Sequence, residues 1–585
     1  MKSTFKKLIL LFITMLLLST SKGNAQKEKI YHYSTICNPI NLNYRFCMDK
    51  PSRREAADPT VVLFNNEYYL FASKCGGYYH STDLINWKLI ETNDLGYHIE
   101  DYAPTVVAIN DALYFLSSSP KPKVFKTSDP KSGKWEIVNH EFKIPMIDPA
   151  LFLDEDGRLY FYYGCSDTEP IRGIELDVKT FNPIGKPVEL INSHKESFGW
   201  ERFGDYNEKN DRPWIEGVWM NKYKGKYYLQ YASPGTQFKS YCDAVYISNN
   251  PLGPFTIAKH NPFSYKPGGY ISGAGHGSTF QDRYGNYWHI ASMSISQKHI
   301  FERRLGIFPV FFDEDGIMYA YTKYGDFPYI MPKQKNNKPQ DIHTKWMLLS
   351  YNKNVEVSSF ITPASYATDE EIRTYWSAQT GNKGEWLMID LGDTCKVNAI
   401  QINFAEHNTQ ITGNMVGRHS DIYYQYLLEY SNDKKNWQTI SNNINNKIDA
   451  PHDYIELADS VNARYIRITN YKVPDGTFAI SDLRVFGNNS KSKSLLPPAN
   501  FTANRDKEDK CKVHLKWNKD DNAVGYNICY GTEKNKLYNN FQVMKKNTLC
   551  IGSLNRNLDY YFTIEAFNEN EIVKTNKIIK CPAFE

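Results

Sequence analysis

A short phrase that occurs five times between residues 58 and 289 constrains the fold more than any other feature of the sequence. Each copy joins an apolar segment to an aromatic segment through a polar turn. The copies start at Asp58, Ala103, Asp148, Glu216 and His276. An apolar segment, a tight turn containing Gly, Asn or Asp and an aromatic segment are typical of a β-hairpin. We therefore expect five hairpins in the first part of the chain, with negligible helix.

The spacing of the copies predicts how the hairpins assemble. Their first residues are 45, 45, 68 and 60 positions apart, and three copies are followed by a further polar turn and an aromatic residue. A unit of about four strands that recurs at such intervals is typical of one blade of a β-propeller. The expected fold of residues 26–335 is therefore a five-bladed β-propeller.

The remainder of the chain shows two further β patterns, at residues 345–488 and 495–585. A segment rich in Lys and Asn, Lys333–Lys338, precedes the first of them. We expect a β-sandwich domain in each region, so the predicted fold class is all-β throughout. The polar linker indicates that the first domain is separable from the rest.

Residues 1–25 are typical of a signal peptide. Lys2, Lys6 and Lys7 precede an apolar run from Leu8 to Leu18, and small residues follow at Gly23–Ala25. The run is too short to span a membrane, so we expect a secreted or periplasmic protein without a membrane span. The formal net charge of +4 equals the four lysines of this segment, which contains no acid. The rest is balanced, and no nucleic-acid partner is expected.

The ten cysteines are irregularly spaced and form no Cys-x-x-Cys motif. We expect a mixture of free thiols and one or two disulfides in an oxidising compartment rather than a metal site. Cys37 with Cys47 is one candidate pair. The other candidates are pairs among Cys511, Cys529, Cys550 and Cys581.

Residues at the same position of successive blades surround one axis, so they meet at the centre although they lie far apart in the sequence. The first position of the phrase holds three carboxylates, Asp58, Asp148 and Glu216, together with His276. A single Asp-Pro pair is usually a turn signal, but three acids at one repeated position favour a chemical role. Hydrolysis of a glycosidic bond needs such a set, because one carboxyl must be protonated while another is ionised. Burial and neighbouring charges separate their pKa values.

Residues 52–330 resemble glycoside hydrolase family 43, whose members are five-bladed propellers that invert the anomeric configuration. The resemblance rests on Ala57-Asp58-Pro59, Ile147-Asp148-Pro149 and Ile215-Glu216-Gly217, which occur in this order. It implies that Asp58 is the general base and Glu216 the general acid. It also implies that Asp148 tunes the pKa of the proton donor and orients it.

Further residues are expected around the substrate. The resemblance implies that His276 lies near the channel centre, either hydrogen-bonding the acids or, through water, beside a calcium ion, since calcium prefers oxygen ligands. It implies that Arg303 or Arg304 reaches the sugar subsite. Tyr102, where many members have Trp, and Trp200 are the expected aromatic platforms for sugar rings. Trp200 lies in a charged insertion that is predicted to form part of the pocket wall.

Residues 347–488 resemble a discoidin-like (coagulation factor 5/8 type C) β-sandwich, as in family 32 carbohydrate-binding modules. The matching segments are Ala367-Thr368-Asp369, Thr374-Tyr375-Trp376 and Glu385–Gly392. The resemblance implies a structural calcium ion near the Asp369 turn. It leaves open whether the module binds sugar or serves only in packing.

Residues 495–585 resemble a fibronectin type III sandwich. Trp517, Tyr526 and Leu554 match its core, and Tyr560 matches the tyrosine that closes one corner of such sandwiches. We expect this domain to act as a spacer.

Together these features predict a secreted, inverting exo-glycosidase that removes terminal pentofuranosyl or related units from an oligo- or polysaccharide of plant type, without an organic cofactor. Within the resembled family an α-L-arabinofuranosidase is expected first, with a β-D-xylosidase or a β-D-galactofuranosidase as alternatives. A non-catalytic carbohydrate-binding propeller is the alternative from another class. It would keep the aromatic residues but would not need Asp58, Asp148 and Glu216.

Overall fold

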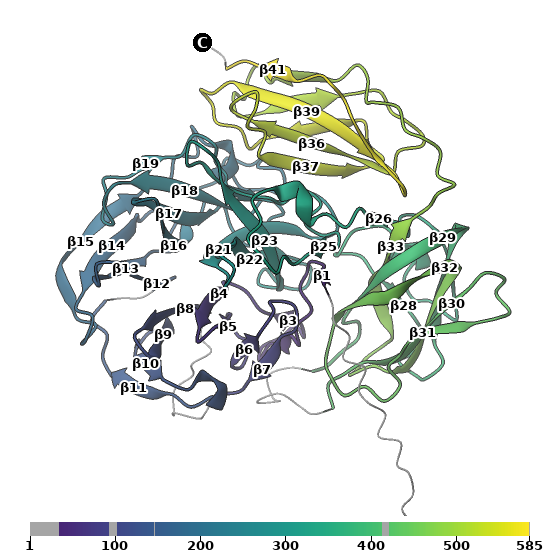
Figure 1. The fold of residues 1–585 in the computed structure, drawn as a ribbon, viewed down its shortest axis with the longest axis horizontal. Helices are drawn as coiled ribbons and strands as arrows, with labels where there is room; N and C mark the ends of the chain where they lie inside the picture. Colours follow the sequence, from purple (N-terminus) through teal and green to yellow (C-terminus); the bar gives the residue numbers. More distant parts are fainter. Residues whose placement is uncertain (1–33, 93–101, 145–146, 412–420, 584–585) are drawn as a thin grey trace, which may run out of the picture. The chain divides into compact units, whose positions relative to one another are not determined.

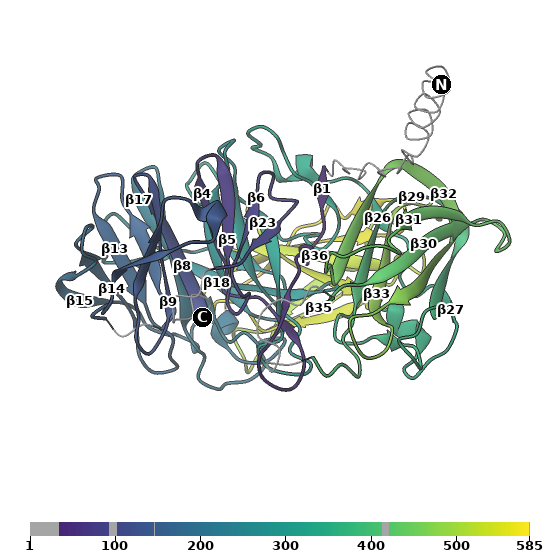
Figure 2. The ribbon, with the colours of Figure 1, turned by 90° about the horizontal axis from the view of Figure 1, so that it is seen from below.

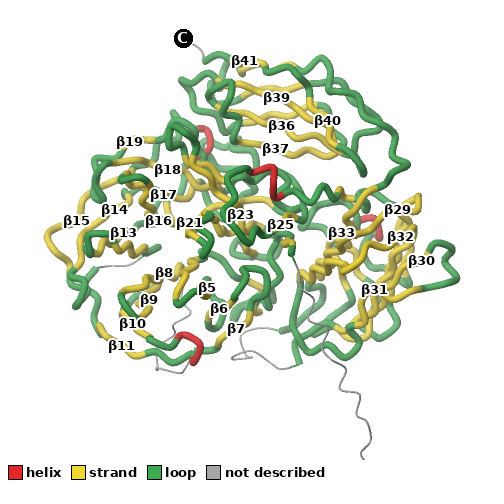
Figure 3. The backbone as a smooth tube through the Cα atoms, viewed as in Figure 1, coloured by secondary structure: helices red, strands yellow, loops and turns green. Residues whose placement is uncertain are grey.

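The computed structural model describes residues 34–92, 102–144, 147–411 and 421–583. About half of the chain is strand, and the only helices of the described residues are four short 3₁₀ helices, so the predicted all-β class is confirmed (Figure 3). No helix in these ranges is long and apolar enough to cross a membrane. The predicted signal peptide, residues 1–25, lies outside the described residues.

Five sheets are antiparallel meanders whose strands follow chain order. The first consists of β4 (Thr60–Phe64), β5 (Glu67–Phe71), β6 (Tyr78–Ser81) and β7 (Lys88–Ile90). The second consists of β8 (Tyr102–Ile109), β9 (Ala112–Ser118), β10 (Val124–Thr127) and β11 (Glu136–Asn139). The third consists of β12 (Ala150–Leu153), β13 (Leu159–Tyr163), β14 (Ile171–Leu176) and β15 (Pro183–Ile191). The predicted hairpins are the first two strands of each sheet.

The fourth and fifth sheets continue the series. The fourth consists of β16 (Glu216–Tyr223), β17 (Lys226–Ser233), β18 (Cys242–Ser248) and β19 (Thr256–Ile257), with β20 (Ser264–Tyr265) also pairing β18. The fifth consists of β21 (Ser272–Gln281), β22 (Tyr287–Ser294), β23 (Arg303–Phe312) and β24 (Met318–Ala320). Two short pairs lie beside them: β1 (Thr35–Ile36) with β25 (Tyr329–Ile330), and β2 (Arg45–Phe46) with β3 (Arg54–Glu55).

Each of the five sheets packs against the next, and the fifth packs against the first. A separate apolar cluster fills every one of these contacts; Phe71 and Trp135 lie in the cluster between the first two sheets, and Val61 and Trp288 in the one that joins the fifth to the first. The first strands, β4, β8, β12, β16 and β21, contact one another in turn. They lie nearest the common centre in Figure 1, and Figure 2 shows the ribbon, with β4 and β8 labelled, from a perpendicular direction. Residues that precede these strands are therefore brought together.

The two remaining regions have cores of their own. Residues 347–488 form one eight-stranded sheet around Trp376 and Ile400. Its strands are β26 (Met347–Leu348), β27 (Asn354–Val357), β28 (Trp376–Ser377), β29 (Trp386–Phe404), β30 (Gln425–Ser431), β31 (Gln438–Asn442), β32 (His452–Lys472) and β33 (Ala479–Asn488). The C-terminal region has two sheets that share one core around Trp517 and Tyr526. They are β34 (Thr502–Arg505), β35 (Val513–Lys516) and β38 (Thr548–Ile551), and β36 (Gly525–Gly531), β37 (Asn539–Met544), β39 (Tyr560–Phe567), β40 (Ile572–Lys574) and β41 (Ile579–Cys581).

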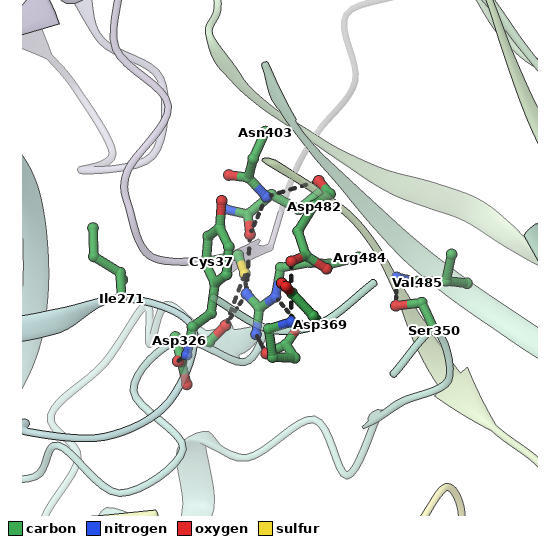
Figure 4. A network of polar contacts seen from close by, with 12 residues as sticks. Cys37, Ile271, Asp326, Ser350, Asp369, Asn403, Asp482, Arg484 and Val485 are labelled. Carbon is green, nitrogen blue, oxygen red and sulfur yellow. Dashed lines mark hydrogen bonds and ion pairs between the residues drawn. The ribbon is translucent and has the colours of Figure 1, made fainter. Parts of the chain in front are cut away.

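The segment Lys333–Lys338 does not separate independent bodies, because residues 34–585 form one unit by their contacts. Arg484 of β33 is fully buried, and its guanidinium donates to the carbonyl oxygen of Asp326 at 2.6 Å and is paired with Glu370 at 2.8 Å (Figure 4). Such a buried cation is tolerated only when carboxylates and carbonyls surround it. The boundary between the first two domains therefore contains a buried polar cluster around Arg484, beside an apolar cluster that includes Phe327 and Phe486.

The expected disulfides are wrong: all ten cysteines, which lie in the described ranges, are free thiols. The thiol of Cys37 donates to the carbonyl oxygen of Asp326 at 3.3 Å, beside Arg484, whereas the thiol of Cys47 donates to Glu55 at 3.2 Å. These two buried thiols therefore donate to different acceptors instead of bonding to each other. The spacing of cysteines in the sequence does not indicate such contacts.

Candidate active site

The start of each of the five sheets carries the same backbone irregularity. Three residue steps stand opposite two steps of the partner, as from Tyr102 to Thr105 opposite Ser118 to Leu116. In the first and third sheets the irregularity lies just before β4 and β12, where Ala57 accepts from Ser73 and Ile147 accepts from Gly164. This is the pattern of a β-bulge. In each bulge one residue has a left-handed backbone, with φ between 44° and 58°. These residues are Asp58, Ala103, Asp148, Gly217 and His276.

The bulges correct the predicted alignment of the fourth copy. Gly217, not Glu216, occupies the left-handed position. Glu216 pairs with Ala232 in the same way as Tyr102 pairs with Ser118, so Glu216 is equivalent to Tyr102 and lies one residue before the position of Asp58 and Asp148. The fourth copy thus carries its acid on the preceding residue, and Gly adopts the left-handed conformation without the steric cost of a side chain.

Asp58 is held by donors on every side. Its Oδ1 accepts from Arg303 Nη1 at 2.9 Å, its Oδ2 accepts from Ser73 Oγ at 2.6 Å, and Ser292 Oγ accepts from its backbone N–H at 2.8 Å. Burial raises the pKa of this carboxyl, but Arg303 and His276 outweigh burial and hold the pKa of Asp58 below its ordinary value. Asp58 is therefore ionised at neutral pH.

The pKa of Asp148 is shifted in the opposite direction. Burial raises its pKa to about 7; the neighbouring carboxylates of Glu216 and Asp58 add to this effect, and His276 opposes it. Nδ1 of His276 lies 3.2 Å from Asp58 Oδ1 and 3.7 Å from Asp148 Oδ2, so this imidazole bridges the two acids. Although burial lowers the pKa of His276, the three carboxylates outweigh it and raise that pKa above its ordinary value.

Glu216 is half-buried at the start of β16 and accepts two hydrogen bonds from side chains. Tyr241 donates its hydroxyl to Oε1 at 2.6 Å, and Cys165 donates its thiol to Oε2 at 3.1 Å. One ligand atom from each of Asp148, Cys165 and Glu216 lies within 4.8 Å of the other two. The three acids and His276, which the sequence predicted to converge, therefore do lie together.

Of the residues expected to meet substrate, Arg303 contacts Asp58, and Tyr102 lies near Arg303 and Glu55. Arg303 is 3% exposed and bonds Asp58 and Glu55, whereas Arg304 points away from Asp58 toward residues of the second domain. Tyr102 is half-buried, with its ring 5.8 Å from that of Phe301. Burial, with the nearby Glu55, raises the pKa of Tyr102 above its ordinary value.

Trp200 is not placed in a pocket wall. It is 0% exposed, its ring stacks on Phe198 at 5.2 Å, and its indole N–H donates to Asn555 of the C-terminal domain at 2.9 Å. A ring without exposed surface cannot stack on a sugar. By contrast Trp214, two residues before Glu216, is 41% exposed.

Several residues of the site were not predicted from the sequence. Ser73 lies two residues after β5, where its backbone N–H donates to the carbonyl oxygen of Ala57, and Ser292 of β22 pairs with Gly275. The two serines are therefore opposite equivalent residues of the repeats, which do contain a signal for them. Glu55, Cys165 and Tyr241 lie at positions outside the repeated phrase, and no local pattern marks them.

His276 makes the direct contacts expected of the hydrogen-bonding role: its ring contacts two carboxylates, and its backbone N–H donates to Asp243 at 2.8 Å. A calcium ion beside His276, reached through water, stays a prediction, because calcium takes six to eight oxygen ligands and its water ligands would complete such a site. A carboxylate cluster does occur at the Asp369 turn: Asp482 Oδ1 is buried without a hydrogen-bond partner, and burial together with Glu370 and Asp369 raises the pKa of Asp482 (Figure 4).

Comparison with known proteins gives two family matches. Residues 51–318 match the model described as Glycosyl hydrolases family 43, and residues 351–481 match the F5/8 type C domain. Among curated proteins, "Xylosidase/arabinosidase 43A" of Humicola insolens is 25% identical over 329 residues, covering 44% of this chain and 94% of that protein.

Two bacterial relatives are matched over shorter shares. "Beta-xylosidase" of Xylanibacter ruminicola is 24% identical over 159 residues, which is 24% of this chain and 46% of that protein. "Non-reducing end alpha-L-arabinofuranosidase BoGH43B" of Bacteroides ovatus is 24% identical over 294 residues, which is 44% of this chain and 50% of that protein. The chain thus spans about half the length of these two relatives. Residues 51–318 are therefore similar to the Glycosyl hydrolases family 43, and residues 351–481 are similar to the F5/8 type C domain.

Proposed function

We propose that the protein is an inverting exo-glycosidase that acts on terminal pentofuranosyl or related units, with an α-L-arabinofuranoside as the first candidate substrate. One observation carries the proposal: the surroundings of two buried acids, Asp58 and Asp148, shift their pKa values in opposite directions. Asp58 is paired with Arg303 and stays ionised, while Asp148, next to Glu216, retains a proton up to a pH of about 7. Acid–base cleavage of a glycoside needs both states in one pocket.

The reaction takes one step. Asp58 accepts a proton from a water molecule as the water oxygen bonds to the anomeric carbon. The bond from that carbon to the leaving oxygen breaks on the opposite face, and Glu216 supplies the proton that this oxygen takes up. Asp148 and His276 keep a proton close to the acids, and Tyr241 and Cys165 hold the Glu216 carboxyl in place. Inversion requires carboxyl groups about 6.5–9.5 Å apart, which leaves room for the water.

Recognition of the sugar falls to the exposed groups around the acids. Tyr102 and Trp214 present ring surface for the faces of the sugar. Arg303 is fixed by Glu55 and Asp58, so it acts mainly on the base. A β-D-xyloside and a β-D-galactofuranoside remain the alternative substrates, because relatives at about one-quarter identity are named as xylosidases, as arabinosidases and as a galactofuranosidase.

The proposal also includes the fold of each domain, export of the protein and a bound calcium ion. The five sheets are the blades of a five-bladed β-propeller, and the two later domains are β-sandwiches, the last of fibronectin type III kind. Support for the latter comes from Tyr560, whose hydroxyl accepts from the backbone N–H of Asn555 at 2.9 Å, as a corner tyrosine does. We further propose export by the segment at residues 1–25, and a calcium ion held by Asp369 and Asp482.

A screen of 4-nitrophenyl glycosides tests the function. We expect release of nitrophenol from one or more of the α-L-arabinofuranoside, β-D-xyloside and β-D-galactofuranoside, with the first cleaved fastest. Proton NMR of the first-formed sugar should show the inverted anomer. Retention of configuration would exclude the single-step mechanism. Failure to cleave any aryl or oligomeric glycoside would favour the carbohydrate-binding alternative.

A further inference from the structure

Two pairs of consecutive residues lie between the acids and the F5/8 type C domain. Arg54 and Glu55 form β3, and Arg303 and Arg304 begin β23. Successive side chains of a strand point to opposite faces. In each pair, therefore, one side chain faces the site and its neighbour faces the second domain.

The side chains that face the site, Glu55 and Arg303, are the inner members of the two pairs. They form a buried chain of hydrogen bonds to Asp58, called the inner relay here. Glu55 Oε1 accepts from Arg303 Nη2 at 2.6 Å, and Arg303 Nη1 donates to Asp58 Oδ1 at 2.9 Å. Glu55 is 0% exposed and Arg303 is 3% exposed. Because the Arg303 guanidinium is planar and held at two nitrogens, its position is set by Glu55 as much as by Asp58.

The outer members are bound by charged and polar groups of the F5/8 type C domain. Arg54 pairs with Asp449 at 2.5 Å and with Glu406 at 2.8 Å. Arg304 lies 3.6 Å from Glu406 and donates through Nε to Nε2 of His452 at 2.8 Å. One carboxylate, Glu406, thus contacts both arginines.

The outer pair also fixes the backbone of both strands. Arg304 Nη1 donates to the carbonyl oxygen of Arg54 at 2.7 Å and to that of Arg303 at 3.0 Å. The carbonyl of Arg54 belongs to the peptide that leads into Glu55. A shift of Arg304 therefore moves the backbone that carries both members of the inner relay.

A second contact of the F5/8 type C domain, made by Arg373, reaches the surroundings of Arg303. Arg373 of the F5/8 type C domain donates to the carbonyl oxygens of Ile295 at 2.7 Å and Gln237 at 3.3 Å. Thr236, next to Gln237, has its hydroxyl 3.4 Å from Arg303 Nη1. The second domain thus reaches the surroundings of Arg303 from two sides.

We propose that the F5/8 type C domain is a positioning element of the glycosidase site. Through Glu406 and Asp449 it holds Arg54 and Arg304. The strands that carry these arginines, β3 and β23, in turn hold Glu55 and Arg303 against Asp58. This role rests on the proposed function for the chemistry that Asp58 performs. It is independent of sugar binding by the domain, and it makes the domain necessary for cleavage of small substrates as well as polymers.

The pH dependence supplies a readout that a merely structural role would not move. Asp58 is faced by Arg303 from β23, by His276 from β21, by Asp148 and by the hydroxyl of Tyr241. Of the positive groups, Arg303 lowers the pKa of Asp58 most. Loosening Arg303 raises that pKa, so the base becomes protonated at a higher pH and the acidic limb of kcat/KM moves upward.

The test compares Glu406→Gln with Glu456→Gln in the full chain, using an aryl glycoside that the wild type cleaves. Glu456 is a matched control, because it belongs to the same domain and binds Ser34 and Thr35 of the first domain, away from β3 and β23. We expect Glu406→Gln to lower kcat about 10- to 100-fold with KM nearly unchanged, and to move the acidic limb to higher pH. Glu456→Gln should leave kcat and the pH profile as in the wild type.

Asp449→Asn is the milder second variant should Glu406→Gln fail to fold, and its kcat should fall in the same direction. Wild-type kcat and an unshifted acidic limb in a folded Glu406→Gln or Asp449→Asn protein would overturn the positioning role. A crystal structure of either variant separates this inference from the proposed function. Displacement of Arg303 from Asp58 supports positioning even if the wild type cleaves no glycoside, and an unmoved Arg303 contradicts it.

Discussion

The proposed base, Asp58, and the proposed acid, Glu216, are supported in different ways. Asp58 is linked through Arg303 and Glu55 to strands whose outer faces are held by buried ion pairs with the F5/8 type C domain. On the other side the C-terminal domain meets the segment at residues 197–207, where Arg202 pairs with Asp509 at 2.7 Å.

The path from the C-terminal domain reaches the core of the fourth sheet rather than Glu216. Glu201, beside Trp200, accepts from the hydroxyl of Tyr231 at 2.7 Å, and both residues are fully buried. Glu216 itself is held by Tyr241 and Cys165. We therefore expect a domain contact to influence catalysis when it acts on strands whose side chains bind the catalytic group, as β3 and β23 do, and otherwise to contribute mainly to stability.

The largest expected effect is at the base. Asp58→Asn removes the group that deprotonates water, so kcat should fall about 10³-fold or more on every substrate. The measurement is turnover of both a 4-nitrophenyl glycoside and an oligosaccharide. Ser73→Ala, which removes one donor to Asp58, should cost less than Asp58→Asn. Activity of Asp58→Asn close to that of the wild type would assign the base elsewhere.

The loss of activity on replacing Glu216 should depend on the leaving group of the substrate. Glu216→Gln should lower kcat/KM about 100-fold on an oligosaccharide but about tenfold or less on a 4-nitrophenyl glycoside, because nitrophenolate leaves with little protonation. Comparing the two substrates in one variant cancels differences in the amount of folded enzyme. Equal losses on both substrates would contradict the assignment of Glu216 as the proton donor.

Asp148 should reveal itself in the pH dependence of stability. Its folded pKa of about 7 exceeds the ordinary 3.8, so the folded state binds more protons between these values and its stability decreases as pH rises through about 7. Asp148→Asn removes this loss. The unfolding free energy of Asp148→Asn minus that of the wild type should therefore increase from pH 4 to pH 8 in urea titrations. A pH-independent difference would mean that Asp148 ionises normally.

The smallest effect on turnover is expected on the C-terminal side. Trp200→Phe removes the hydrogen bond to Asn555 and leaves a small cavity, so the free energy of unfolding should fall by about 1–3 kcal/mol. KM and kcat of the folded protein should not change, and thermal unfolding with parallel kinetics measures both. If instead KM rose with no change in stability, Trp200 would be a sugar platform as the sequence had suggested.

How far the sequence predicted the site depends on where each signal lies. The repeated phrase located the starts of all five sheets and the acids Asp58, Asp148 and Glu216, because hairpin chemistry is local. It misaligned Glu216 by one residue, since an apolar pattern does not reveal a bulge. The glycine at position 217 was the available clue, because a left-handed backbone favours Gly.

Other residues had no local signal. Arg303 and Asp58 are 245 positions apart, and Arg54 and Asp449 are 395 apart. Aromatic content predicted a sugar platform at Trp200, but an aromatic ring suits a domain interface equally well, and only the position of Asn555 decided between them.

The sequence by itself determined the all-β class, the series of hairpins and the acidic character of the centre, because strand alternation, turn residues and repeat spacing are encoded over short distances. The tertiary structure decided the ionisation of each acid and the role of the neighbouring domains. Asp58 and Asp148 follow the same kind of local sequence, yet Arg303 keeps one ionised while burial beside Glu216 keeps the other protonatable. The physical reason is that a pKa depends on charge and solvent within a few ångströms in space, and in this chain those neighbours come from distant segments.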